Sequence, residues 1–193
     1  MKSLLLFLVT TLLFTVGTQS SNIKQKLAIA DDSGFIGLVN SELYQGFVDE
    51  DWELKDLMKR FKEQTNLGHA TVWSTGVQNT MTVHILQQPS AKKHHRQTTS
   101  QIKVTNDTLW LVNYTDLSML AQFDDETIPS RDNDDLSIPL KSGNYSITLR
   151  KMFDPEEYRW NNPPDPCFEL TFTPTTKPAK NRFKDVIWWR EDR

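Results

Sequence analysis

Histidines are the first residues to consider, because imidazole serves both as a metal ligand and as a general base. His94 and His95 are adjacent, so on an extended backbone they point in opposite directions and do not readily bind one metal ion together. His69 and His84 fall on neighbouring strand candidates and could face each other, but neither has a cysteine or carboxylate at ligand spacing. The sequence therefore predicts a solvated basic loop around residues 92–96, and no bound metal or cofactor.

Cys167 is the only cysteine, so an intramolecular disulfide is excluded. Its thiol could act as a nucleophile with His69 or His84 as the base. Against this, the nearby Glu169 would raise the thiol pKa, and the alternation of the segment places Cys167 opposite the core-facing Phe168. We interpret Cys167 as an ordinary strand residue that, if exposed, could link two chains through an intermolecular disulfide.

An acidic stretch from residue 124 to residue 135 is the first candidate binding surface. Its second half, Asp132-Asn133-Asp134-Asp135, resembles the start of a calcium loop but lacks the glycine and distal glutamate of an EF-hand, which favours a polar turn. A dense acidic surface would meet a basic surface on a protein partner, because complementary charge speeds association and selects partners. The candidate residues are Asp124, Asp125, Asp132, Asp134 and Asp135.

The six tryptophans supply the second set of candidates. Trp160 adjoins a proline-rich loop, while Trp188 and Trp189 are consecutive on a strand candidate, so one of those two should face away from the core. An outward tryptophan suits a binding surface, and all three could stack on a carbohydrate. Packing beneath a loop is the alternative, and it is favoured.

The sequence lacks the patterns of the common enzyme classes, namely G-x-S-x-G, H-E-x-x-H, the Walker loop and the dinucleotide fingerprint. A formal net charge of −3 at pH 7 argues against nucleic acid as a partner. The residues therefore favour a non-enzymatic protein. A small exported hydrolase, whose site would gather His69, His84 and the acidic stretch, remains an alternative.

The first twenty residues predict export. Lys2 precedes the apolar run Leu4–Val16, and small polar residues follow up to Ser20. The run has about 13 residues, fewer than the roughly 20 that cross a bilayer. We predict a signal peptide over residues 1–20, cleaved near Ser20, and a single β-rich domain over residues 21–193 that is secreted or periplasmic and not held in a membrane.

The elements that must position the candidates are mainly strands. One apolar stripe at helical spacing predicts an amphipathic helix over about residues 51–65, and its members are Leu54, Leu57, Met58 and Phe61. Elsewhere the hydrophobic period is two, in short runs separated by turn signals. This pattern is typical of an antiparallel β-sandwich or open barrel with one helix. An α+β fold is the alternative.

Several short stretches occur in a recognisable order. They are Tyr44-Gln45-Gly46-Phe47, Ala70–Ser74, Ile102–Thr105, Asn106-Asp107 with Leu109-Trp110, and Leu140–Tyr145. Their order resembles that of the competence protein J family of small exported-nuclease inhibitors, whereas the helix at 52–64 and the chain after Phe153 depart from it. The resemblance implies a sandwich that binds another protein and has no catalytic residues to transfer.

The function that we favour is that of an exported, soluble β-sandwich that binds a protein partner as an inhibitor or immunity-type protein. A small exported hydrolase and a carbohydrate-binding module are the alternatives.

Overall fold

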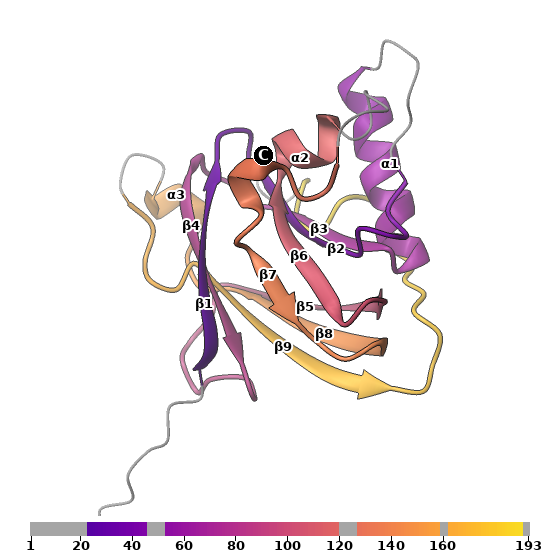
Figure 1. Cartoon of the computed structure of the whole chain (residues 1–193). Helices are drawn as coiled ribbons and strands as arrows, with labels where there is room; N and C mark the ends of the chain where they lie inside the picture. The colour runs from indigo at the N-terminus through magenta and orange to yellow at the C-terminus, as the bar shows by residue number, and fades with distance from the viewer. Residues whose placement is uncertain (1–22, 46–52, 120–126, 159–161, 191–193) are drawn as a thin grey trace, which may run out of the picture.

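Two β-sheets face each other, and helices cover the outer face of the second sheet (Figure 1). The computed structural model describes residues 23–45, 53–119, 127–158 and 162–190. Asp124, Asp125 and Trp160, and the expected signal peptide, lie outside these ranges. No helix within the described ranges is long and apolar enough to cross a membrane.

Sheet one has five strands in the order β1-β4-β9-β8-β5. Neighbouring strands are antiparallel except for β4 and β9, which are parallel. The bounds are β1 Ile23–Asp31, β4 Asn79–Leu86, β9 Phe168–Thr175, β8 Gly143–Lys151 and β5 Arg96–Val104. The prediction of a sandwich is confirmed, but this sheet is mixed rather than purely antiparallel, and it does not close into a barrel.

Sheet two has four antiparallel strands in the order β3-β2-β6-β7. The bounds are β3 Ala70–Ser74, β2 Phe35–Val39, β6 Thr108–Asn113 and β7 Ser137–Pro139. All five residues of β2 and all five of β3 are buried, because this sheet packs against sheet one on one face and against helices on the other. Strands covered on both faces lose the polar alternation of a half-exposed strand.

The predicted helix is α1, Leu54–Leu67. It begins after Glu53, whose side chain and that of Asp56 form a reciprocal capping box. It ends at Gly68, which adopts φ 74°, and Leu57, Met58 and Phe61 pack on sheet two. The other helical segments are short: α2 Tyr114–Met119, α3 Pro155–Tyr158 and the 3-10 turn η1 Arg131–Asn133.

Cys167 is a correction to the sequence interpretation, because its side chain belongs to the core between the sheets and is 1% exposed. The thiol donates to the Pro164 carbonyl oxygen at 3.2 Å, and the Thr82 backbone N–H donates to Sγ at 3.2 Å. Burial raises the pKa of the Cys167 thiol. The buried thiol is therefore suited neither to nucleophilic attack nor to a disulfide between two folded chains.

The last strand candidate, Val186–Trp189, forms only an isolated parallel bridge, between Ile187 and Trp73 of β3. The Ser74 backbone N–H donates to the Ile187 carbonyl oxygen at 2.9 Å. This contact holds the C-terminal segment, which we define as residues 181–190, against the outer edge of sheet two.

Candidate functional site

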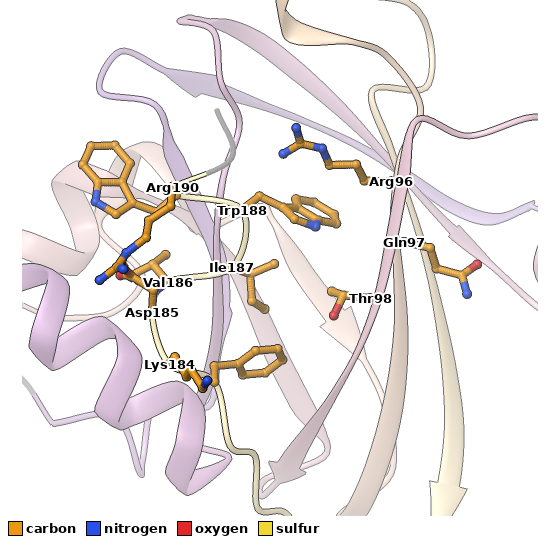
Figure 2. A pocket seen from close by; sticks show the side chains of 11 residues that line it. Arg96, Gln97, Thr98, Lys184, Asp185, Val186, Ile187, Trp188 and Arg190 are labelled. Carbon is orange, nitrogen blue, oxygen red and sulfur yellow. Dashed lines mark hydrogen bonds and ion pairs between the residues drawn. The ribbon is translucent and has the colours of Figure 1, made fainter. Parts of the chain in front are cut away.

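A groove of about 480 Å³ opens between β5 and the C-terminal segment (Figure 2). Arg96, Gln97 and Thr98 form the β5 side, and residues 183–190 form the other side. Figure 2 shows the Trp188 side chain extending from the C-terminal segment towards β5. The groove lies where the edges of the two sheets diverge, because β5 ends sheet one and the C-terminal segment lies along the β3 edge of sheet two.

Amide side chains hold the C-terminal segment in place. Asn66, at the end of α1, accepts from the Phe183 backbone N–H at 2.8 Å and donates to the Phe183 carbonyl oxygen at 3.0 Å. Asn181 does the same for Gln101 of β5, accepting from its N–H at 2.8 Å and donating to its carbonyl oxygen at 2.9 Å. The segment after β9 is thereby tied to both α1 and β5, and Figure 1 shows it passing the end of α1.

Trp188 and Trp189 pack into two different cores. Trp188 adopts φ 63° and is 7% exposed; its ring stacks on Phe168 with 6.5 Å between centroids, and the Lys151 Nζ lies 5.0 Å from the centroid of the ring. The Trp189 ring packs on Phe35, beyond sheet two, with 4.8 Å between centroids. Both side chains therefore pack against other residues, which the sequence favoured as the alternative to an outward-facing tryptophan. The half-buried Trp189 also lines the groove.

A second hollow, of about 430 Å³, continues the groove along α1. Its α1 side includes Leu54 and Met58, and Leu54 is 46% exposed although it opens the apolar stripe of the helix. The two hollows share Lys184, Asp185, Trp189 and Arg190. We call their combined lining the basic groove.

Positive charge dominates the basic groove. Its lining carries six cationic side chains against one carboxylate, Asp185, which pairs with Arg190; the cations are Lys55, Lys59, Lys62, Arg96, Lys184 and Arg190. Lys55 and Lys59 pair with Glu53 and Glu63 at 2.6 and 4.0 Å, but exposed pairs of this kind hold their charges loosely. Since the whole chain has a net charge of −3, this positive surface is a local feature.

A polar row crosses the outer face of sheet one. Lys26, His84, Glu169, Arg150 and Gln97 are cross-strand neighbours in that order. The loop that joins β4 to β5 crosses this row: Ser90 donates to Glu169 Oε2 at 2.7 Å through Oγ, and its carbonyl oxygen accepts from Arg150 at 2.7 Å. The polar row therefore serves to hold the β4–β5 loop on the outer face of sheet one.

The structure separates the two histidines that the sequence allows to face each other. His84 lies on β4 of sheet one, whereas His69 immediately precedes β3 of sheet two. Burial lowers the pKa of both imidazoles; Asp165, with Oδ1 2.8 Å from His84 Nε2, opposes this effect at His84. The two histidines therefore do not come together in one site, as the hydrolase alternative requires.

The acidic candidates that the structure describes, Asp132, Asp134 and Asp135, are all exposed. Between them, Asn133 is buried and donates to Asp116 Oδ2 at 2.9 Å, which fixes the turn. Across the described residues, no group of three or more His, Cys, Asp or Glu side chains could hold a metal ion. These three carboxylates precede β7, at the opposite edge of sheet two from the C-terminal segment.

The sequence did not reveal the basic groove, because its two walls are far apart along the chain. The lysines of α1 give an ordinary solvated helix face, and the cations near the C-terminus give no recognisable pattern. Only the packing of the C-terminal segment between α1 and β5 brings them together. The one signal in the sequence was the pair Trp188 and Trp189, candidate binding residues that do line the groove.

Comparison with known proteins identifies distant similarities of fold. No family model matches the chain, and no curated protein matches it. Among solved structures, one described as crocagin biosynthetic gene J aligns with a TM-score of 0.46 and 10% identity over 77% of this chain and 95% of that one.

A second solved structure, ComJ from Bacillus subtilis, an inhibitor of the DNA-degrading activity of NucA, aligns with a TM-score of 0.43 and 12% identity. The alignment covers 78% of this chain and 96% of ComJ. The resemblance to the competence protein J family noted in the sequence is thus confirmed as a faint likeness between folds, and no residue role is transferred from it.

Proposed function

We propose that this protein binds a partner protein through the basic groove and acts by occupying that partner, as an inhibitor or immunity-type protein does. The observation that carries the proposal is the composition of the groove: apolar and aromatic side chains are framed by six cations on a chain of net negative charge. Tryptophan, methionine and arginine are the residues enriched where proteins bind one another. The partner surface that complements this groove is acidic.

The groove offers contact and charge rather than reactive groups. Among the described residues that line it, Thr98 carries the single hydroxyl, and there is no histidine or cysteine. This inventory supports binding in preference to hydrolysis.

The exposed carboxylates of Asp132, Asp134 and Asp135 support a second binding surface, which would meet a basic patch on a partner. We also propose, from the apolar leader, that export removes residues 1–20 and that the protein acts outside the cytoplasm.

Charge variants distinguish the two surfaces. Purified protein lacking residues 1–20 is used to capture partners from an envelope extract, which are identified by mass spectrometry. The variant K59E/K184E reverses two groove charges, D132N/D134N/D135N neutralises the acidic surface, and K141E/K177E reverses two exposed lysines outside the groove. We expect K59E/K184E to capture at least about tenfold less partner than the parent protein, since two groove charges that would attract an acidic surface then repel it. K141E/K177E should capture as much partner as the parent protein does.

Loss of capture only in D132N/D134N/D135N would move the binding surface to the acidic residues. Failure of the unmodified protein to enrich any protein over a blank resin would overturn protein binding altogether.

A further inference from the structure

We propose, resting on the function proposed above, that the partner contributes an extended acidic segment that binds as an added strand on the outer edge of β5. The added strand would occupy the groove between β5 and the C-terminal segment. The partner class is therefore a polypeptide with an exposed, acidic, strand-forming stretch.

The backbone of β5 is oriented for such pairing. The backbone N–H and carbonyl oxygen of Gln101 point away from β8 and bond to the Asn181 side chain. The Lys103 N–H also points away from β8 and donates to the Gly68 carbonyl oxygen at 2.8 Å. Backbone groups alternate in direction along a strand, so Gln97 and Thr99 present their N–H and C=O groups to this same side. Within the described ranges, no strand pairs with β5 there.

Asn181 shows that the edge accepts an amide. Its side chain makes the donor and acceptor contacts to Gln101 that the backbone of an added strand would make. It covers one end of the edge, and Ser100 is buried against Thr71 of β3, which leaves the stretch from Arg96 to Thr99, about 13 Å at the usual rise per residue. This stretch is where the groove begins, since Arg96, Gln97 and Thr98 line it.

The two edges of sheet one differ in how they are protected. The β1 edge carries Lys24 and Lys26 and has a register irregularity between Ile23 and Gln25. Lysines and bulges are devices that discourage strand addition. On β5, the exposed Lys103 lies at the end of the edge that Gly68 and Asn181 already occupy, and the exposed Gln97 and Thr99 provide neither device. This part of the β5 edge is therefore the one suited to accept a strand.

Charge selects the occupant. Side chains of an added strand on the Arg96 and Thr98 side would lie in the groove with Lys184 and Arg190, which favours carboxylates at every second position. Backbone pairing supplies affinity, and the alternate side chains supply specificity, as in other cases of strand addition.

The test uses a fluorescein-labelled peptide of alternating Glu and Val, EVEVEVE. Its anisotropy is measured with the mature protein at about 50 mM salt, where charge contacts are weakly screened. The controls are the block peptide EEEEVVV and an EVEVEVE peptide that is N-methylated at alternate residues, in both possible phases. We expect EVEVEVE to bind at least about tenfold more tightly than the block peptide and than one of the two N-methylated forms, because N-methylation in the pairing phase removes the backbone donors to β5. The form that is methylated in the other phase should keep most of the affinity.

Two further measurements locate the strand. Hydrogen exchange of the Gln97 and Thr99 amides should slow on binding of EVEVEVE, and K59E/K184E should bind it more weakly than K141E/K177E does. These readouts follow the native protein, so no variant of β5 has to fold.

Equal binding of EVEVEVE and both N-methylated forms would overturn strand addition, while a partner captured through the groove would keep the proposed function. No binding of EVEVEVE by a protein that does capture its partner would also overturn strand addition. Binding of a single-stranded oligothymidylate in place of the peptides would overturn a polypeptide occupant and assign the groove to nucleic acid.

Discussion

His84 is a buried histidine whose pKa is lowered by its surroundings. Burial is the largest influence and lowers its pKa from 6.5; Asp165 opposes this, and Lys26 and Lys92 lower it further. The folded protein therefore binds a proton at this site more weakly than the unfolded chain does. The stability contribution of His84 is complete above the unfolded pKa of 6.5 and is lost as the pH falls below that value.

We predict that His84→Gln flattens this pH dependence. Urea unfolding at about pH 7.5 and 5.5 should show the parent protein losing stability on acidification and His84→Gln losing less of it. His69→Gln is the matched comparison, because the pKa of His69 is also lowered, by burial and by Lys103. An unchanged loss of stability in His84→Gln would show that His84 does not contribute.

Single residues show where sequence patterns stop being informative. Alternation along the strand placed Cys167 opposite Phe168, yet both side chains are buried in the same core, because Cys167 precedes β9 and lies outside its regular alternation. The left-handed φ of Trp188 was equally hidden, since a tryptophan rarely adopts it. Such departures come from tertiary contacts that the local sequence does not encode.

At the scale of elements, the hydrophobic periodicity predicted well which segments are helices or strands, but it predicted poorly which strands pair with one another. The apolar stripe located α1 within a few residues, and the period of two is seen in β8, where Tyr145, Ile147 and Leu149 are buried and the residues between them are not. The parallel pairing of β4 with β9 could not be predicted, because it joins stretches separated by the whole of β5 to β8.

The end of α1 depends on Gly68 for two reasons. Its φ is 74°, and a Cβ there would lie 2.5 Å from the Ala179 Cβ and 2.9 Å from the Ala179 carbonyl oxygen. Gly34 shares the left-handed conformation, with φ 81°, but the nearest atom to its Cβ would be 4.0 Å away.

We predict that Gly34→Ala costs about 1 kcal/mol of unfolding free energy from backbone strain alone, and that Gly68→Ala costs about 2–4 kcal/mol because the steric clash is added. Chemical denaturation measures both. Equal losses in the two variants would mean that the chain at Ala179 shifts away from α1 without energetic cost.

For the whole molecule, charge is segregated between the two edges of sheet two. The C-terminal segment and its cations lie along β3, while Asp132, Asp134 and Asp135 lie ahead of β7. The acidic side could be predicted from the sequence, because its carboxylates lie close together along the chain. It could not identify the basic side, which exists only once α1, β5 and the C-terminal segment have packed together.

We predict that capture of the partner by the basic groove weakens as salt rises. Between about 50 and 500 mM salt the screening length falls from roughly 14 to 4 Å, so contacts between exposed charges lose most of their strength. Capture followed over this range should decline steeply for the parent protein and only slightly for K59E/K184E. A salt-independent yield for the parent protein would show that apolar contact, and not charge, holds the partner.

The position of β9 in the centre of sheet one constrains how the chain can be made. β9 begins at Phe168, yet it lies between β4 and β8, whose residues leave the ribosome earlier. Until β9 has emerged, β1 with β4 and β5 with β8 remain as two separate antiparallel pairs whose apolar faces lack a common centre. Sheet one is therefore completed only after β9 has emerged, and its assembly depends on contacts that are distant along the chain, which is the class of topology that folds slowly.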